Sequence, residues 1–208
     1  MLTSRNLSGA GKMAANGKRK LKLQVQMSVD GFVGRPNGEL DWMTWDWDDK
    51  IKNYVNELTD SVDTILLGRK MTDGFVSYWT DVVSRPDDLQ YDFARKMVDK
   101  PKVVFTKTLD KSPWKNTTIA KGELADEIKK LKGKPGKDII VYGGASFVSS
   151  LVRNNLIDVY HIFINPAVIG KGISIFQDLN NHFKLNLVKS IGFECGIVLN
   201  HYRPVREN

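Results

Sequence analysis

The chain carries the stretch Ile139-Ile140-Val141-Tyr142-Gly143-Gly144-Ala145-Ser146-Phe147, in which four apolar residues run into a glycine pair. The apolar run predicts a buried strand, and residues 145–153 predict the helix that follows it. Glycine lets the backbone turn tightly and approach a ligand, because it has no Cβ atom. The first turn of a helix offers free N–H groups and a positive dipole end, which suit a phosphate. The stretch predicts either a phosphate-binding turn or an ordinary glycine-containing strand–helix turn.

The same pattern occurs a second time upstream. Thr64-Ile65-Leu66-Leu67 is another apolar run, and it ends in Gly68-Arg69-Lys70-Met71-Thr72. Two cations follow the glycine here, and an arginine can hold a phosphate through two parallel hydrogen bonds. Two strands that both end in anion-binding turns indicate a site for a nucleotide cofactor.

The rest of the chain alternates predicted strands with predicted helices. We expect strands at 21–27, 61–67, 102–105, 117–120, 139–142 and 159–164, and helices at 48–58, 72–79, 89–98, 124–131 and 145–153. Residues 183–194 and 196–202 predict a closing antiparallel hairpin. Strands that alternate with helices favour parallel pairing, which predicts an α/β fold with a mostly parallel sheet and an antiparallel end.

The net charge of +7 is concentrated near the amino terminus. The first 22 residues carry six basic residues and no acidic residue, and the remainder is close to neutral. Because a basic tail is not a folded basic face, we expect no nucleic-acid partner. Residues 1–19 predict a disordered basic tail or a leader, and residues 20–205 predict a single domain.

Several other classes of protein are excluded by what the sequence lacks. No run approaches the roughly 20 apolar residues that cross a bilayer, so we expect no membrane partner and a cytoplasmic protein. The lone Cys195 excludes an internal disulfide and a multi-cysteine zinc site. His161, His182 and His201 are far apart in the sequence and lack metal-ligand spacing, so we expect no metal.

The common nucleotide and hydrolase motifs are also missing. Neither G-x-G-x-x-G nor G-x-x-x-x-G-K-[ST] occurs, which excludes the Rossmann fingerprint and the P-loop. Residues 144–148 begin like the nucleophile elbow G-x-S-x-G, but Val148 replaces its second glycine. Hydride transfer fits better, because a bound cofactor then performs the difficult chemistry and the protein positions it.

Three predicted strand ends carry groups suited to a dinucleotide. They are Gly68-Arg69-Lys70, Thr106-Lys107 and Gly143-Gly144-Ala145-Ser146. In open α/β sheets, ligands bind outside the carboxyl ends of the strands, so one extended ligand could contact all three. Three basic side chains exceed what a pyrophosphate on a helix end requires, and the surplus favours NADP over NAD. The alternative for Arg69 and Lys70 is a solvated strand end.

The order of these motifs resembles a known superfamily. Ser28-Val29-Asp30-Gly31-Phe32-Val33-Gly34 is followed by Gly68-Arg69-Lys70, by Tyr142-Gly143-Gly144 and by Pro166 with Gly170-Lys171-Gly172. The chain resembles the dihydrofolate reductase superfamily between about residues 21 and 204. It is most similar to the reductase domain, at the carboxyl terminus of the bifunctional riboflavin-biosynthesis deaminase–reductase, and to its stand-alone relatives. The resemblance implies a sheet of about eight strands, NADPH as the hydride donor, and a homodimer.

The resemblance also implies roles for individual residues. The adenosine-side phosphates would be held by Gly68, Arg69, Lys70 and Met71, and the 2′-phosphate would lie near Thr106 and Lys107. The pyrophosphate would be capped by Ala145, Ser146 and Phe147. The nicotinamide would lie near Val33 and Gly34. In the family the glycine pair forms a cis peptide, which points to Gly143–Gly144 here.

The substrate side of the predicted site departs from the family. True dihydrofolate reductases have Leu-Pro-Trp before an acidic residue, whereas this chain has Leu40-Asp41-Trp42 and then Trp45-Asp46-Trp47-Asp48-Asp49. Asp46 or Asp48 could assist protonation of a pterin- or pyrimidine-like ring, while the alternative for Asp48 is a helix cap. Asp30, Trp47 and Trp79 are the further candidates for substrate contacts, although such aromatic residues are more often part of a core.

The sequence as a whole predicts an NADPH-dependent reductase of a small heteroaromatic or imine-like molecule. The favoured reaction is the reduction of 5-amino-6-(5-phosphoribosylamino)uracil in riboflavin biosynthesis. The zinc deaminase signature is absent, so we expect a stand-alone reductase. Dihydrofolate reductase activity and a non-catalytic NADP-binding module are the alternatives.

Overall fold

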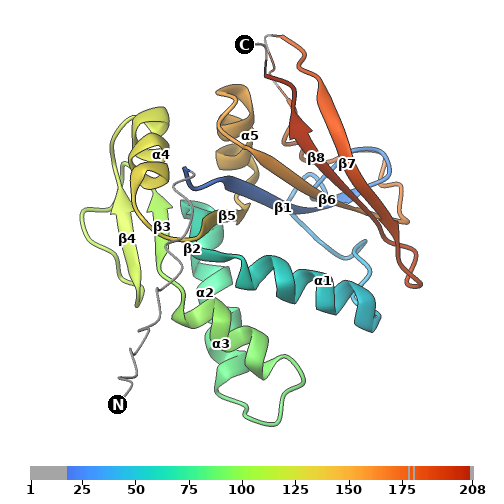
Figure 1. Cartoon of the computed structure of the whole chain (residues 1–208). Helices are drawn as coiled ribbons and strands as arrows, with labels where there is room; N and C mark the ends of the chain where they lie inside the picture. The colour runs from blue at the N-terminus through green and yellow to red at the C-terminus, as the bar shows by residue number, and fades with distance from the viewer. Residues whose placement is uncertain (1–17, 178, 180, 207–208) are drawn as a thin grey trace, which may run out of the picture.

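The structure, a computed structural model, describes residues 18–177, 179 and 181–206. They form an eight-stranded sheet in the order β4-β3-β2-β5-β1-β6-β8-β7 (Figure 1). The strands are β1 (Leu21–Ser28), β2 (Val62–Gly68), β3 (Lys102–Phe105), β4 (Thr117–Ala120), β5 (Asp138–Gly143), β6 (Val159–Asn165), β7 (Leu185–Gly192) and β8 (Val198–Pro204). The first six strands of this order, from β4 through β6, are parallel to one another, and β8 and β7 add the antiparallel end. The predicted fold class is confirmed.

Helices cover both faces of the sheet. They are α1 (Asp49–Asp60), α2 (Arg69–Val83), α3 (Tyr91–Asp99), α4 (Leu124–Gly133) and α5 (Ala145–Arg153). Alternate residues of a strand point to opposite faces. Leu66 of β2 packs in the cluster that includes α4 and α5, and its neighbours Ile65 and Leu67 pack with residues of α1, α2 and α3. The two helix layers are separated by the sheet in Figure 1.

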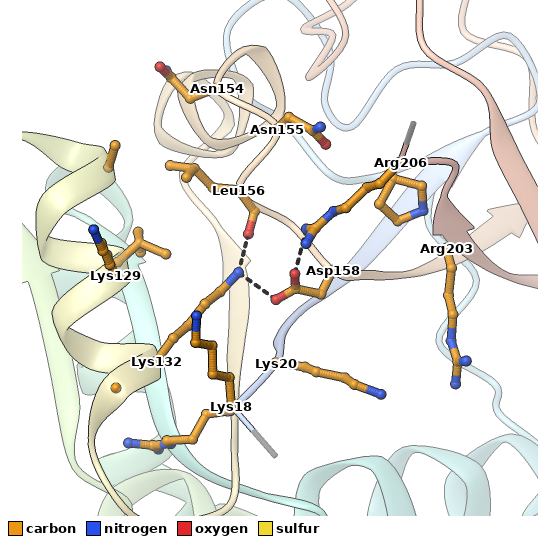
Figure 2. Close-up of a pocket in the computed structure, with 15 residues that line it drawn as sticks. Lys18, Lys20, Lys129, Lys132, Asn154, Asn155, Leu156, Asp158, Arg203 and Arg206 are labelled. Carbon is orange, nitrogen blue, oxygen red and sulfur yellow. Dashed lines mark hydrogen bonds and ion pairs between the residues drawn. The ribbon is translucent and has the colours of Figure 1, made fainter. Parts of the chain in front are cut away.

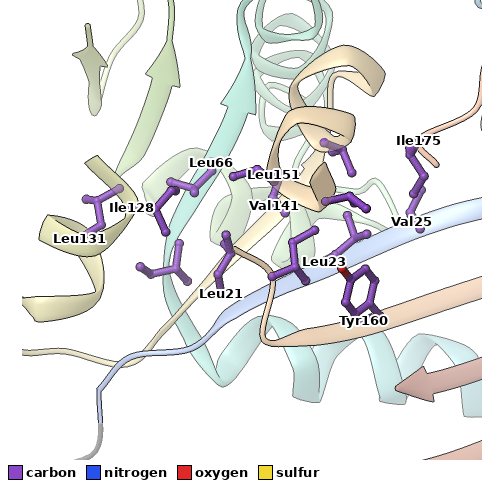
Figure 3. Close-up of a cluster of buried hydrophobic side chains, with 14 of the residues drawn as sticks. Leu21, Leu23, Val25, Leu66, Ile128, Leu131, Val141, Leu151, Tyr160 and Ile175 are labelled. Atoms are coloured by element: carbon purple, nitrogen blue, oxygen red, sulfur yellow. The ribbon is translucent and has the colours of Figure 1, made fainter. Parts of the chain in front are cut away.

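The largest hydrophobic cluster lies between β1, β5 and the layer of α4 and α5 (Figure 3). Leu21, Leu23 and Val141 are fully or almost fully buried, and Leu151 of α5 covers them. The alternation of apolar and polar residues in β1 has its cause here, because only one face of this strand meets the apolar layer. Burial of this kind supplies the main favourable term in folding.

The helix after β2 is longer than the sequence pattern suggested. The prediction placed it at 72–79, whereas α2 begins at Arg69 directly after Gly68. The hydroxyl of Thr72 donates to the carbonyl of Gly68 over 3.0 Å, which binds the first turn of the helix to the strand end. Strand and helix therefore meet without a loop, and the cations of this turn belong to the helix.

The predicted tail lies largely outside the described residues. Lys18 and Arg19, which the predicted boundary assigned to the tail, are described, and Arg19 is buried. Its guanidinium bonds to Asp63 and to the hydroxyl of Thr64. None of the helices in the described ranges is long and apolar enough to cross a membrane.

Strand β7, at the antiparallel end, is the most exposed strand of the described sheet. Strand β7 is an edge strand, and Leu187 and Val188 are about half exposed on it. An open edge with apolar side chains is a place where a second chain can pair. The homodimer implied by the resemblance stays a prediction.

Candidate functional site

The carboxyl ends of the parallel strands lie at one edge of the sheet. From this edge the chain continues toward one or the other face of the sheet, depending on the strand. The chain leaves β5 toward the layer of α4 and α5, whereas it leaves the neighbouring strands β1 and β2 toward the layer of α1, α2 and α3. Such a divergence opens the space in which open α/β sheets bind ligands. Both predicted glycine turns are located at this divergence.

Gly68 and Gly144 lie against one another across β2 and β5. A Cβ atom added to Gly144 would lie 2.9 Å from Cα of Gly68, and one added to Gly68 would lie 3.1 Å from Cα of Gly144 and 3.0 Å from Cβ of Phe147. Real Cβ atoms essentially never come within 3.0 Å of another heavy atom, so the contact requires glycine at position 144. At position 68 a Cβ atom would force its neighbours to move by a few tenths of an ångström. The sequence predicted two separate glycine turns, and the structure brings them into contact.

The contact brings two helix N-termini together. Gly68 is the N-cap of α2 and Gly144 is the N-cap of α5, and neither helix has a side chain that caps it. The first N–H groups of a helix have no partner inside the helix and carry its positive dipole end. Ala145, Ser146 and Phe147 form the first turn of α5, and their contact with a pyrophosphate stays a prediction.

The glycine pair itself has a different geometry from the family expectation. Within the described residues no cis peptide bond occurs, so the predicted cis bond between Gly143 and Gly144 is wrong for this structure. The turn is made by positive φ values instead, 158° at Gly143 and 81° at Gly144. A Cβ atom on Gly143 would lie 2.9 Å from Sδ of Met71, so the start of α2 closes over this turn.

Basic side chains surround the two glycine turns unevenly. Arg69 donates to Asp73 over 2.8 Å, and its guanidinium lies 5.0 Å from the ring centre of Trp114. The indole N–H of Trp114 donates to the other oxygen of Asp73 over 3.0 Å. Lys70 and Lys107 are exposed, and within the described residues neither forms an ion pair. The region of the two glycine turns thus contains two exposed lysines and one arginine that is already paired with Asp73.

The end of β3 is coupled to α5 by aromatic stacking. The rings of Phe105 and Phe147 stack with centroids 4.8 Å apart. Thr106 and Lys107 follow Phe105, and the hydroxyl of Thr106 accepts the N–H of Thr108 over 3.1 Å. The structure therefore places the predicted 2′-phosphate residues one strand away from Gly68, on the side opposite to β5.

Val33, Gly34 and Asp30 lie on the other side of β5, beyond β1. The N–H of Val33 donates to the carbonyl of Ile173, and the N–H of Ile173 donates to the carbonyl of Gly34, both over 2.8 Å. Asp30 accepts from Ser28 over 2.7 Å and from the N–H of Gly170 over 2.7 Å. The bond from Ser28 holds the pKa of Asp30 below its usual value. Its carboxylate fastens the loop after β6 to the end of β1.

The two aspartates proposed for protonation occupy different environments. Asp48 caps α1, because one oxygen accepts the N–H of Ile51 over 2.9 Å and the other accepts the N–H of Glu194 over 2.8 Å. The bond from Ile51 lowers the pKa of Asp48 below its usual value. The helix-cap alternative is confirmed. An ionised carboxylate that accepts two hydrogen bonds is a poor proton donor. Asp46 is exposed.

The tryptophans proposed for the substrate are not brought together. Trp47 donates its indole N–H to the carbonyl of Thr44 and stacks on Trp45. Trp79 packs against Phe75, Tyr78 and Phe93 between α2 and α3. The indole of Trp42 is buried, and its N–H has no hydrogen-bond partner within the described residues. Trp79 is half-buried and packs against the hydrophobic core.

Comparison with known proteins identifies the family. The family model described as the RibD C-terminal domain matches residues 19–199, nearly the whole chain. The chain belongs to the RibD C-terminal domain family. The resemblance found from the motifs is confirmed.

The relatives of this RibD C-terminal domain match most of its length. The uncharacterised protein YyaP of Bacillus subtilis (strain 168) is 31% identical over 183 residues, which cover 87% of this chain and 93% of YyaP. A Shewanella sp. PV-4 protein assigned to riboflavin biosynthesis superposes with a TM-score of 0.68 at 24% identity, covering 90% of this chain and 99% of the other. The Thermotoga maritima diaminohydroxyphosphoribosylaminopyrimidine deaminase/5-amino-6-(5-phosphoribosylamino)uracil reductase gives 0.63 at 18%, covering 90% and 57%.

Two features of this domain were missed by the sequence analysis. Asp73 and Trp114 organise Arg69, and the spacing of Arg69 and Asp73 by four helical residues could have revealed the first of them. Asn165 at the end of β6 is completely buried. It donates to Gln26 over 2.7 Å and accepts the N–H of Thr44 over 2.9 Å, which anchors the tryptophan-rich loop. No local sequence pattern predicts this contact.

Two of the three histidines, which are far apart in the sequence, are neighbours in the fold. His161 and His201 are paired residues of β6 and β8, and their rings stack with centroids 4.6 Å apart. The hydroxyl of Tyr54 lies 2.8 Å from Nδ1 of His161. Burial lowers the pKa of His161 to about 3, and the neighbouring His201 adds to this effect. The pair is therefore neutral at neutral pH.

Proposed function

We propose that this RibD C-terminal domain is an NADPH-dependent reductase of a small heteroaromatic or imine-like substrate. The observation that carries the proposal is the contact of Gly68 with Gly144, which unites two helix N-termini at the carboxyl edge of the sheet. The first substrate candidate is 5-amino-6-(5-phosphoribosylamino)uracil, because the name of the Thermotoga maritima relative includes that reductase activity.

The residues present fit a dinucleotide that carries an additional phosphate. The helix N-termini at Gly68 and Gly144 offer N–H groups to a pyrophosphate, and a side chain at either position would fill the space. Arg69, Lys70 and Lys107 offer the further positive charge that a 2′-phosphate requires. When bound, NADPH supplies the hydride.

The chain's own residues would orient the reactants and limit water. The segment Val33–Gly34, held by two hydrogen bonds to Ile173, would form the wall beside the nicotinamide. The loop with Trp42 and Trp47, anchored by Asn165, would border the substrate. Since Asp48 is committed to two N–H groups, its role in this proposal is to position α1, and the proton would come from Asp46 or from solvent.

The test is a titration of the purified protein with NADPH and NADH, followed by protein fluorescence. We expect tighter binding of NADPH, and at least a ten-fold loss of its affinity in Arg69→Ala, because a charge-assisted contact to phosphate is removed. Arg85→Ala is the matched control: Arg85 lies just beyond the carboxyl end of α2 and pairs with an aspartate four residues away, as Arg69 does. Its affinity should stay within two-fold of the wild type.

The outcomes separate the functions that compete. Oxidation of NADPH with the aminouracil phosphate supports the riboflavin-pathway reaction, and oxidation with dihydrofolate alone would replace it by the second candidate. NADPH binding without turnover of either substrate would favour a non-catalytic module. The reductase proposal fails if neither nucleotide binds.

A further inference from the structure

A large cavity in the described part of the chain lies far from the glycine turns. Its volume is about 900 Å³, and it is located at the amino-terminal edge of the parallel strands. Lys20 immediately precedes β1, Asp158 immediately precedes β6, and Lys129 and Lys132 belong to the carboxyl-terminal half of α4. The proposed reductase site is at the opposite edge, so the reaction makes no use of this cavity.

The cavity is strongly basic. Seven basic side chains and one acidic side chain line it. The acidic residue, Asp158, is already neutralised, because Lys132 and Arg206 converge on its two oxygens (Figure 2). The N–H of Leu21 also donates to it over 2.8 Å. The single carboxylate therefore organises the cavity and leaves its positive charge in excess.

The excess of positive charge in the cavity is larger than the negative dipole ends of the adjoining helices would require. Lysines commonly offset the negative dipole end of a helix, and α4 and α5 both end beside this cavity with about half a charge each. Lys132 serves in this way, since it also donates to the carbonyl of Leu156 over 2.8 Å. Lys18, Lys20, Lys129 and Arg203 remain, and within the described residues they form no ion pair.

Two of these cations are held in place by their backbone. Arg19, between Lys18 and Lys20, is buried and bonds to Asp63 and Thr64. The N–H of Lys20 donates to the carboxylate of Asp138 over 2.8 Å. Figure 2 shows Lys129 arriving from α4 on one side and Arg203 from β8 on the other. Positive side chains thus surround the opening from several elements.

Apolar atoms complete the lining between the cations. Ile128, Leu156 and Pro204 contribute to the wall, and Ile128 is almost completely buried. Cavities of roughly 300–1,000 Å³ are the usual size for a small-molecule ligand. A concave space of this size suits a compact ligand better than a nucleic-acid duplex, which needs an extended basic face.

We propose that this cavity binds an organic polyphosphate, a small molecule with two or more phosphate groups on a compact ring-shaped or apolar body. The phosphates would contact Lys20, Lys129 and Arg203, and the body would pack on Leu156 and Pro204. This site is separate from the glycine turns, and its existence does not depend on the reductase activity.

Calorimetric titration of the full chain at 150 mM NaCl tests the proposal with ATP, inorganic tripolyphosphate and adenosine. We expect ATP to bind, tripolyphosphate to bind at least three-fold more weakly, and adenosine not to bind measurably. The triple variant Lys20→Ala/Lys129→Ala/Arg203→Ala should lose at least ten-fold in ATP affinity. Because these side chains are exposed, the variant should fold, which its melting temperature and its unchanged NADPH affinity would show.

The matched control removes the same charge elsewhere. Lys50→Ala/Lys52→Ala/Lys189→Ala changes three exposed lysines outside the cavity, and its ATP affinity should stay within two-fold. Equal losses in both triple variants would reduce the effect to general electrostatics and overturn the proposal. Absence of ATP binding, or binding lost only in Arg69→Ala, would also overturn it. A DNA duplex that displaces ATP at lower concentration would replace the small molecule by nucleic acid.

Discussion

The two edges of the sheet offer positive potential to a ligand in different ways. At the carboxyl-terminal edge, backbone N–H groups are held by two helices whose N-caps, Gly68 and Gly144, touch. At the amino-terminal edge, long side chains such as Lys20 and Arg203 surround a cavity. A backbone site has its geometry set before the ligand arrives, while lysines and arginines must give up rotamer freedom to bind. Binding at the carboxyl-terminal edge should therefore be selective and should be lost on a single substitution. Binding at the amino-terminal edge should accept different ligands and tolerate single substitutions.

The largest effect is expected from Gly144→Ala. The new Cβ atom would lie 2.9 Å from Cα of Gly68, and φ at this position is 81°. An unfavourable φ alone costs about 1–3 kcal/mol, and the collision with backbone adds to it. We expect the melting temperature to fall by several degrees and the NADPH affinity to fall at least ten-fold, measured by thermal denaturation and fluorescence titration.

Gly74→Ala makes the same chemical change inside α2 and serves as the control. A Cβ atom at Gly74 meets nothing within 4 Å. Alanine is favoured over glycine in a helix by roughly 0.5–1 kcal/mol, so this variant should be slightly more stable and bind NADPH normally. If both variants behaved alike, the close contact of the two helix N-termini would have no special role, and the contrast between the edges would disappear.

The histidine pair between the two edges limits the pH range in which they can be compared. Since burial lowers the pKa of His161 to about 3 in the folded state, the unfolded chain binds more protons below about pH 6.5. Stability should therefore fall as the pH decreases from about 6.5 toward 3. The loss between pH 7 and pH 5.5 should be about 1 kcal/mol for this residue, measured by urea denaturation.

His161→Gln should flatten this dependence, because glutamine does not titrate. His182→Gln makes the same substitution at an exposed position and serves as the control. A slope that persists in His161→Gln would assign the acid sensitivity to other groups, with His201, whose pKa is also lowered by burial, as the next candidate.

The smallest effect is expected from Asp73→Asn at the carboxyl-terminal edge. Asp73 competes with a phosphate for Arg69, and the bond from Arg69 holds the pKa of Asp73 below its usual value. Asparagine keeps an oxygen for the indole N–H of Trp114 but removes the charge. We expect NADPH to bind about two- to five-fold more tightly, with NADH unchanged. Weaker NADPH binding would show instead that the charge of Asp73 is needed to orient Arg69.

The difference between the edges also explains which contacts could be predicted from the sequence. The glycine turns are local patterns of a few residues, so Gly143-Gly144 and Gly68-Arg69-Lys70 were found directly. The amino-terminal cavity draws residues from both ends of the chain and from its middle, Lys20, Lys129 and Arg203 among them. Lys129 falls in the predicted helix 124–131, and nothing local in the sequence shows that it faces a second basic segment.

The sequence by itself determined the strands, the helices, the class of sheet and the two turns that approach a ligand. These follow from hydrophobic periodicity and from glycine, which act over a few neighbouring residues. Only the tertiary structure decided that Gly68 touches Gly144, that Asp48 caps a helix and that His161 stacks on His201. Those contacts depend on the order of strands in the sheet, which the crossovers set. Two residues far apart in the chain meet only when that order places them side by side.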